Sequence, residues 1–531
     1  MISPFAGKVI KGAAIISFFT VIGKGMGLVQ KMVIAHGFGT GTEAAAFVLA
    51  FSSIVFTFFS VPQQLLSPFL PLFAERKETA GEAEAWRFAS SVGVLVAIAM
   101  GIIVVAGMIW APTLVAVVTS SKASPETCQM AAKLTRIMLP AAFFMGLFYL
   151  AILVLNSYKR FALPAMGDTL NKALVIILLI LLYRSMGIKG LAIGILVGAF
   201  AALVLQFYGL REKLGMVKLA VGFRDPTLKR LGWLLPPIVL SLLIGQSRII
   251  LDYWFASDMG EGYTAGLNYA RGLSDTLISI VPSAVGVAIY PFFSDLSAEG
   301  DRAELIDSLM RSIRMMAFIF LPLSVLLIVL RTPVVQLIFQ RGKFDMESVA
   351  LTTGPLLYYS TGLVFFAVEI ILMRFYFSLK DTLTPTLVGI ACVAIHVTVV
   401  LTFRSAMQHQ SMALAATVSK ATKVLLLLFL LRYKTLLLPF RESLTFVAKS
   451  LLTAVGMGAV VWLAYRGTSA LLPVPPHAGQ LVRAAILAVQ IGVSSLAGMA
   501  AFGALAAAFR MEEAGMVLKL LHRSRYRGAQ S

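Results

Sequence analysis

Long apolar stretches separated by short polar loops run along the whole chain. A helix needs about 20 predominantly apolar residues to cross the hydrocarbon core of a bilayer, so the pattern predicts about fourteen membrane-spanning helices. We place them at residues 10–35, 43–73, 88–118, 129–156, 163–183, 189–210, 231–257, 264–293, 306–330, 349–378, 384–403, 411–431, 444–465 and 481–509. The predicted fold class is therefore an all-α polytopic membrane protein.

Several landmarks in this pattern occur twice, about 220 residues apart. They are Ile22–Gly23 with Ile244–Gly245, Val61–Pro62 with Val281–Pro282, Leu70–Glu75 with Tyr290–Asp295, and Lys159–Pro164 with Lys380–Pro385. The chain is thus predicted to be a duplicated unit. Repeats of this size in an apolar chain are typical of secondary transporters, which bind substrate where the two halves meet.

The predicted spans divide into two sets of six and one pair. We expect an N-lobe at 1–210, a cytoplasmic linker at 211–230, a C-lobe at 231–432, two further helices at 433–509 and a basic cytoplasmic tail at 510–531. Because six is even, both repeats enter the membrane in the same direction and are parallel. We expect the two six-helix repeats to form a V-shaped transporter.

Composition agrees with a membrane location and restricts the partners. Hydrophobic residues make up 59% of the chain and charged residues 13%, which excludes an ordinary soluble domain. The formal charge is +20, but the basic residues lie in short loops and not on one face, so we expect no nucleic-acid partner. Their distribution satisfies the positive-inside rule if the protein is a multi-pass protein of the cytoplasmic membrane with both termini in the cytoplasm.

Ionisable residues inside the predicted spans are few and cluster on particular helix faces. Each Arg, Lys or Asp near the bilayer centre costs about 2.5–3.5 kcal/mol, so each needs a reason to be there. We predict that a cationic cavity binds an anionic headgroup through Lys24, Lys31, Arg248 and Arg271. Asp252, Asp275 and Glu369 are predicted to orient these cations or to couple transport to an ion.

A structural alternative remains open for some of these residues. Arg248 and Asp252 are four residues apart, as are Arg271 and Asp275, so each pair can also neutralise itself along its own helix. Lys420 and Lys423 share a helix face, where they either reach the membrane surface or bind a ligand.

Catalytic chemistry is poorly supported, and we expect the protein not to be an enzyme. The five histidines are scattered, the two cysteines are isolated, and no glycine loop precedes a Lys-Ser or Lys-Thr pair. We therefore expect no metal, no cofactor and no direct coupling to ATP. Coupling to the membrane potential or to a monovalent ion is a hypothesis.

Three motifs resemble those of the MurJ/MviN family of lipid II flippases, in the multidrug/oligosaccharidyl-lipid/polysaccharide exporter superfamily. They are Leu155–Pro164, Phe339–Phe344 and Arg374–Pro385, and their motif residues are Asn156, Arg160, Pro164, Gly342, Lys343, Phe344, Arg374, Tyr376, Asp381, Thr384 and Pro385. The resemblance covers nearly the whole chain. It implies a bacterial inner-membrane protein in which arginines hold a pyrophosphate headgroup and the last two helices form a groove for the polyprenyl tail.

The chain departs from the family pattern in its first lobe. The first span reads Phe19–Met26 and supplies Lys24 where the family carries two arginines. The run Phe51–Phe59 of the second span has no arginine, and Arg271 stands one residue early on the eighth span. Lysine cannot reproduce the bidentate grip of a guanidinium on phosphate, so the substrate can differ.

We therefore predict a flippase that moves lipid II, the polyprenyl-diphosphate-linked peptidoglycan precursor, from the inner to the outer leaflet by alternating access. The expected partners are this lipid-linked glycan, membrane lipids and, as candidates, cell-wall synthesis proteins. The alternatives are a flippase for an exopolysaccharide or O-antigen unit, a cation-coupled drug antiporter of the same superfamily, a membrane glycosyltransferase, and a scaffold without transport activity.

Overall fold

The computed structural model describes residues 4–66, 68–218, 222, 225–435, 440–475, 477 and 479–515. All regular structure in these ranges is helical, so the predicted all-α class is confirmed. Most of the predicted basic tail at 510–531 and part of the linker at 211–230 lie outside the described residues.

Contacts divide the chain into two compact units. Unit 1 comprises Met1–Asn268 with Gly342–Phe344, and unit 2 comprises Tyr269–Arg341 with Asp345–Ser531. The predicted lobe boundaries at 210 and 231 concern the duplicated sequence and stay a prediction.

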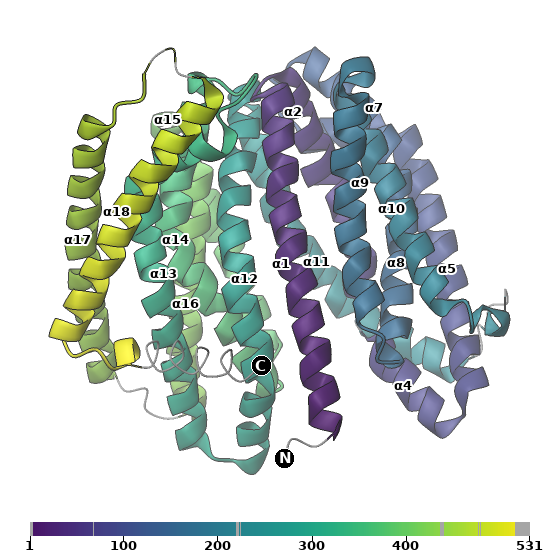
Figure 1. Cartoon of the computed structure of the whole chain (residues 1–531). Coiled ribbons are helices and arrows are strands. Elements are labelled where there is room, and N and C mark those ends of the chain that lie inside the picture. Colours follow the sequence, from purple (N-terminus) through teal and green to yellow (C-terminus); the bar gives the residue numbers. More distant parts are fainter. Residues whose placement is uncertain are drawn as a thin grey trace. The chain divides into compact units, whose positions relative to one another are not determined.

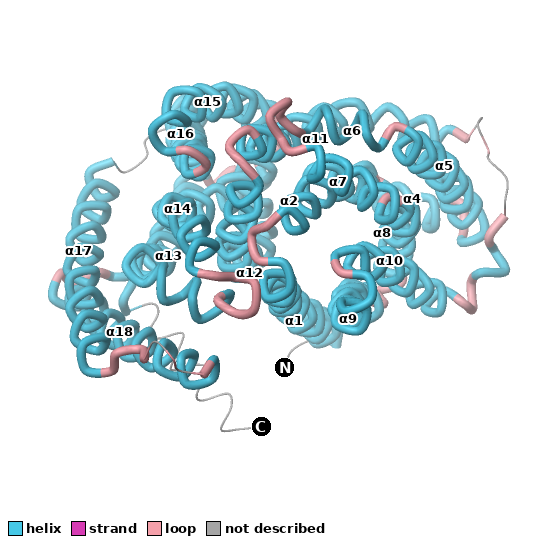
Figure 2. The backbone as a smooth tube through the Cα atoms, turned by 90° about the horizontal axis from the view of Figure 1, so that it is seen from above, coloured by secondary structure: helices cyan, strands magenta, loops and turns pink. Residues whose placement is uncertain are grey.

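Unit 1 contains the first eleven α-helices, two short non-α helices and the start of the twelfth α-helix (Figure 1). They are α1 (Pro4–Phe38), α2 (Thr42–Val48), η1 (Leu49–Val55), α3 (Phe56–Leu65), α4 (Phe69–Thr79), α5 (Glu82–Ile109), α6 (Ala111–Val118), α7 (Pro125–Met138), α8 (Pro140–Ser157), α9 (Ala162–Met186), α10 (Ile188–Leu210), η2 (Leu214–Met216), α11 (Pro226–Ser257) and α12 (Glu261–Glu299). In the view from above, α1, α2, α7, α8, α10 and α9 follow one another in a ring (Figure 2). Near α4, α5 and α8, the stacked rings of Phe69, Phe73 and Phe88 form part of a buried core.

Unit 2 contains the rest of α12 and the six helices that follow. These are α13 (Arg302–Phe339), α14 (Met346–Ser378), α15 (Leu383–Met407), α16 (Gln410–Thr435), α17 (Phe440–Leu471) and α18 (Gln480–Ala508). The fully buried Phe375 and Tyr376 of α14 lie in the main core, and α17 and α18 pack on α13 through a separate cluster around Met457 and Phe502.

Thirteen helices among the described residues are long and apolar enough to cross a membrane, and each overlaps a predicted span. The remaining predicted span, 264–293, lies within α12, which is not among those thirteen. Two of the predicted spans are interrupted at proline. The helix chain breaks between α3 and α4 at Pro68, and α7 gives way to α8 at Pro140, because proline lacks the N–H that would continue the helix.

The duplication is visible in the backbone of the turns. Residues with positive φ recur about 220 residues apart, as Gly39 with Gly260, Gly81 with Gly300, Lys159 with Lys380, and Gly187 with Gln408. Few residues other than glycine adopt this conformation, so four matched positions are far more specific than matched apolar runs. They confirm that the two halves are copies of one pattern of helices and turns.

The third pair of turns shows how closely the copies agree. After α8 the amide of Arg160 donates to the carbonyl of Leu155 at 3.0 Å, and after α14 the amide of Asp381 donates to the carbonyl of Tyr376 at 3.0 Å. Both are Schellman caps, in which a left-handed residue closes the helix end. The lysines at 159 and 380 are those left-handed residues.

Candidate functional site

Lys31 is the centre of a polar cluster inside unit 1. Its ammonium lies 3.2 Å from the side-chain oxygen and 3.3 Å from the backbone oxygen of Asn268 on α12. The Asn268 amide donates to the hydroxyls of Ser52 on η1, at 3.1 Å, and of Tyr253 on α11, at 2.7 Å. We call Lys31, Ser52, Tyr253 and Asn268 the Lys31 cluster. Asn268 thus connects one cation of α1 with hydroxyls of η1 and α11, so that two parts of the chain more than 200 residues apart meet in otherwise apolar spans.

The backbone under this cluster is unusual. Leu49–Val55 forms a π-helix between α2 and α3, with Ser52 and the buried Ser53 in its middle. A π-helical segment holds an extra residue in the turn and changes the direction of the side chains that follow, and such segments are frequent at functional sites. The π-helix therefore marks the same place as the Lys31 cluster.

The predicted pair of Arg248 and Asp252 lies on α11 beside this cluster. The guanidinium is 3.6 Å from the Asp252 carboxylate, which is 1% exposed, while the arginine side chain is 20% exposed. Asp252 directly precedes Tyr253 of the cluster. Gln246, earlier on the same helix, donates to the Ser60 hydroxyl of α3 at 2.9 Å. Gln246 and Tyr253, seven residues apart on one face of α11, therefore both make polar contacts with other elements of unit 1.

Lys24 lies on α1 two turns before Lys31, where α1 packs against α9. A Cβ on Gly23 would be 3.0 Å from the Asp168 carboxylate, and that carboxylate pairs with Lys172 at 2.6 Å. The sequence offers Lys24 no acidic residue within a turn of its own helix, whereas the fold brings Asp168 of α9 close to Gly23, the residue before Lys24. Asp168 and Lys172, four residues apart on α9, therefore form an ion pair along one helix face.

Arg271 and Asp275 form their pair in unit 2. The guanidinium is 3.5 Å from the carboxylate, with side-chain exposures of 17% and 62%. Because the acidic partner is exposed, this pair is weaker than one closed off from water. Arg248 with Asp252 and Arg271 with Asp275 therefore each pair within their own helix, as the structural alternative expects. Their predicted role in binding a headgroup stays a prediction.

Glu369 forms a buried ionic triad in unit 2. Its carboxylate on α14 binds the ammonium of Lys420 through one oxygen and that of Lys423 at 2.7 Å through the other, and its side chain is 10% exposed. We call these residues the Glu369 triad. Neither alternative considered for Lys420 and Lys423, reaching the membrane surface or binding a ligand, anticipated this pairing between α14 and α16.

The motif residues of the second copy fix helix ends and contacts. The Tyr376 hydroxyl donates to the carbonyl of Leu427 on α16 at 2.6 Å. Asp381 accepts from the amide of Thr384 at 3.0 Å and so starts α15, with Pro385 in its first turn. The Arg374 guanidinium lies 6.0 Å from the centre of the Tyr290 ring.

The motif around Gly342 docks on the end of α1. Gly342 has φ of +56°, and a Cβ there would be 2.3 Å from the backbone oxygen of His36, so only glycine fits. The amide of Lys343 donates to that oxygen at 2.9 Å, its ammonium lies 3.6 Å from Glu43, and Phe344 is buried.

The first motif ties α8 to the segment after α10. Arg160 donates to the carbonyl of Gly209 at 2.9 Å and pairs with Glu212 at 3.1 Å. Pro164 is buried in the first turn of α9, and Asn156 is in the last turn of α8. In these three motifs the described contacts are structural.

Sequence reasoning missed Asn268, Ser52 and Tyr253. The available signal was an asparagine within an apolar span, because an amide in hydrocarbon needs partners. The sequence does not say which helix packs against Asn268 and supplies its partners.

Two duplicated sets of spanning helices, with cations held in polar clusters inside apolar segments, define a polytopic membrane protein of the transporter class. The family model for "Lipid II flippase MurJ" matches residues 34–474. The chain belongs to the MurJ family.

Individual relatives agree with this assignment. The chain is similar to the lipid II flippase MurJ of Burkholderia cenocepacia, with 26% identity over 460 residues that cover 85% of this chain and 89% of the relative. It is also similar to the probable lipid II flippase MurJ of Vibrio cholerae, with 25% identity over 475 residues that cover 86% and 89%.

Solved structures show the same fold. A lipid II flippase MurJ in an inward closed conformation matches with a TM-score of 0.76 and 22% identity, covering 94% of this chain and 99% of that chain. An inward-facing multidrug resistance MATE family transporter of the MOP superfamily matches with a TM-score of 0.68 and 15% identity, covering 78% and 94%.

Proposed function

We propose that this protein translocates lipid II from the inner to the outer leaflet of the bacterial cytoplasmic membrane by alternating access. The observation that carries the proposal is the match to the lipid II flippase family over residues 34–474. Both termini would lie in the cytoplasm, as the distribution of basic loops favours. Proteins of cell-wall synthesis are the expected partners on either side of the transport step.

In this proposal the diphosphate of the substrate contacts cations while the polyprenyl tail stays in lipid. Lys31 is the strongest candidate because its ammonium is already oriented by Asn268, and a preoriented cation needs less reorganisation to receive an anion. Lys24, Arg248 and Arg271 would contribute further charge, with Asp252 and Asp275 orienting the arginines. The helices α17 and α18 would accommodate the tail.

A second candidate substrate follows from the lysines in the first span. Lysine is a point charge, whereas arginine grips phosphate through two parallel hydrogen bonds. A flippase for another polyprenyl-diphosphate-linked glycan, such as an exopolysaccharide or O-antigen unit, would use the same mechanism with a different headgroup.

The function is tested by complementation. We expect the gene to restore growth and rod shape to a bacterium depleted of its own lipid II flippase. The control is a family member known to support growth, expressed at the same level. Failure to restore growth, with full membrane insertion and with accumulation of lipid II in the inner leaflet, would contradict lipid II as the substrate and favour the second candidate.

We propose that transport is driven by the membrane potential and not by a monovalent cation at Glu369. Both carboxylate oxygens of Glu369 already bind ammonium groups, which supports this choice. Moving one elementary charge across 100 mV is worth about 2.3 kcal/mol. We therefore expect flipping in proteoliposomes to slow severalfold when valinomycin and potassium collapse the potential, and to be unchanged when sodium is replaced by choline. The opposite pattern of responses would exclude this coupling.

A further inference from the structure

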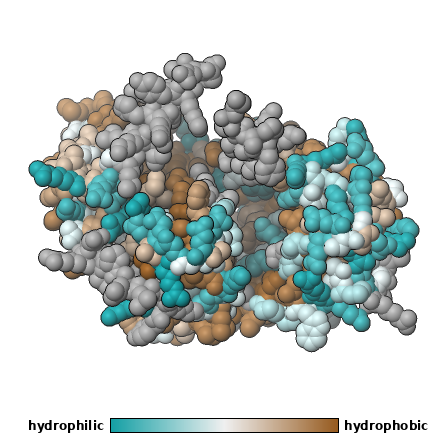
Figure 3. Space-filling view, turned by 90° about the horizontal axis from the view of Figure 1, so that it is seen from below, coloured by the Kyte–Doolittle hydropathy of each residue, from teal (hydrophilic) through white to brown (hydrophobic). Residues whose placement is uncertain are grey.

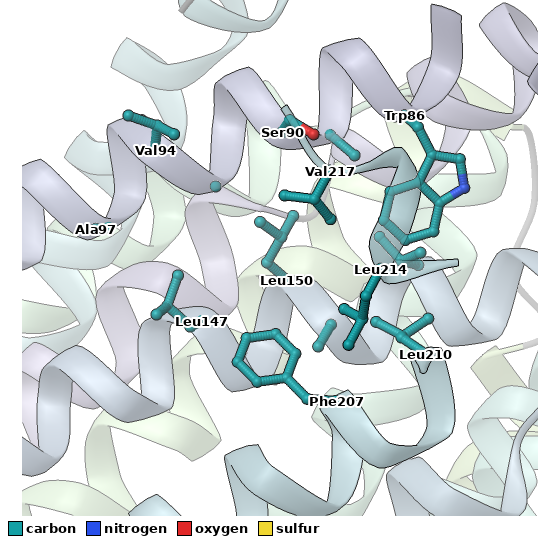
Figure 4. A pocket seen from close by; sticks show the side chains of 14 residues that line it. Trp86, Ser90, Val94, Ala97, Leu147, Leu150, Phe207, Leu210, Leu214 and Val217 are labelled. Carbon is teal, nitrogen blue, oxygen red and sulfur yellow. The ribbon is translucent and has the colours of Figure 1, made fainter. Parts of the chain in front are cut away.

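An apolar pocket of about 240 Å³ lies within unit 1, apart from the Lys31 cluster. Figure 4 shows side chains of α5, α8 and α10 around it, including Trp86, Leu150 and Phe207, with Leu214 and Val217 of the following segment beside them. Its walls are apolar almost throughout.

The pocket has the length of one membrane leaflet. Its lining on α5 runs from Trp86 to Ala97, and at 1.5 Å per residue that distance is about 16 Å. Half of the hydrocarbon core of a bilayer is about 15 Å. A single extended alkyl chain entering beside Trp86 would thus reach about the middle of the membrane.

A basic segment lies at the end of the pocket near Trp86, with one acidic side chain, Glu82, beside it. The segment 211–218 contains Arg211, Lys213 and Lys218 and one acidic residue, so its net charge is +2. The Lys218 amide donates to the Ser90 hydroxyl at 3.1 Å, and Ser90 lines the pocket, so this lysine is at the entrance. Seen from below, hydrophilic side chains cover this end of unit 1, on the right of Figure 3.

Hydrogen bonds hold this segment against the helices. The Trp86 indole donates to the Tyr158 hydroxyl at 2.8 Å, and Lys213 pairs with Glu82 at 3.0 Å. Tyr158 donates in turn to Glu82. Burial and this bond to a carboxylate raise the pKa of Tyr158 to about 12. The entrance is therefore a built structure and not a loose loop.

We propose that this pocket binds one acyl chain of an anionic phospholipid of the inner leaflet, with its phosphate at Lys218. The apolar pocket fits the acyl chain of such a lipid, and the basic entrance fits its phosphate. Basic pockets at the cytoplasmic ends of spanning helices are typical sites for anionic headgroups. The lipid would fasten the segment that leads from α10 to α11 onto unit 1. This inference does not depend on which glycan is transported.

Photocrosslinking of the full-length protein tests the site. Nanodiscs of phosphatidylcholine would contain a small fraction of phosphatidylglycerol or phosphatidylcholine with a diazirine in the acyl chain, and crosslinked peptides would be mapped by mass spectrometry. We expect the phosphatidylglycerol probe to label residues 86–97 and 214–217 more strongly than the phosphatidylcholine probe, by about fivefold for each basic group at the headgroup.

Matched variants separate the pocket from general lipid contact. A Cβ on Gly93 would lie 3.4 Å from Leu150, so Gly93→Leu fills the pocket and should remove the labelling. Gly101→Leu, two turns further on α5, would meet no described atom within 4 Å at its Cβ and should keep it. Lys218→Glu should remove the preference for phosphatidylglycerol, whereas Lys189→Glu at the other end of α10 should not.

Two results would overturn the inference. One is equal labelling of this pocket by the two probes, or labelling that persists in Gly93→Leu. The other is displacement of the phosphatidylglycerol probe by undecaprenyl phosphate at equal or lower concentration, which would assign the pocket to a polyprenyl chain.

Discussion

Replacing Lys31 with alanine is expected to abolish complementation and to slow lipid II flipping in proteoliposomes by about ten- to a hundredfold. A hydrogen bond to a charged group is worth about 1.5–3 kcal/mol, and the proposed role of Lys31 is to provide such a bond to the diphosphate. The substitution also leaves Asn268 without the cation that it now contacts at 3.2 Å. The measurement is the initial flipping rate with the variant protein reconstituted at the same density as wild type.

Two control variants test whether the effect depends on the positive charge at position 31. Lys31→Arg keeps the charge and should retain most of the rate, and Lys189→Ala removes an exposed lysine at the start of α10 and should change nothing. If Lys31→Ala protein folds, inserts and flips at the wild-type rate, Lys31 does not bind the headgroup. The Lys31 cluster would then be a structural network.

Removing the carboxylate of Glu369 is expected to destabilise the protein strongly. In Glu369→Ala two ammonium groups remain in unit 2 without the anion that they share, and breaking a buried ion pair from one side costs about 3–5 kcal/mol. We expect a markedly lower apparent melting temperature in detergent and a smaller folded fraction by fluorescence-detected size exclusion.

A second prediction for the Glu369 triad is that stability returns when all three charges are removed together. Replacing all three charges in Glu369→Leu, Lys420→Met and Lys423→Met together should recover most of the lost stability, because apolar residues of similar size often replace buried ion pairs without loss. Asp307→Ala removes the exposed partner of Arg311 and should have an effect below about 1 kcal/mol. A single Glu369→Ala variant as stable as wild type would show that the triad contributes little.

The positions of thirteen of the predicted spans could be read from the sequence, because hydropathy over about 20 residues reports directly on the bilayer. The duplication could also be predicted, because the residues that form corresponding turns are repeated in the sequence about 220 residues apart. Lys159 and Lys380 each end a helix in the left-handed conformation, and the surrounding sequence is repeated with them. Breaks at Pro68 and Pro140 depend on local chemistry but were placed inside continuous spans, since hydropathy does not register them.

The polar clusters could be predicted only in part. Arg248 with Asp252 and Arg271 with Asp275 were found because their partners are four residues apart on one helix. Glu369 is 51 residues from Lys420, and Lys31 is 237 residues from Asn268. Partners on different helices depend on how the helices pack and face one another, which a single sequence does not encode in any short pattern.

The two left-handed lysines also say something about how the protein enters its membrane. A residue with a Cβ is strained in this conformation by about 1–2 kcal/mol, and glycine would avoid the strain. Yet lysine occupies the site in both copies, at positions 159 and 380. On the face that we propose to be cytoplasmic, each places a positive charge directly after a span, where it resists translocation. The chain thus accepts local backbone strain at corresponding places in its two copies, and we infer that the two charges help to set its orientation during insertion.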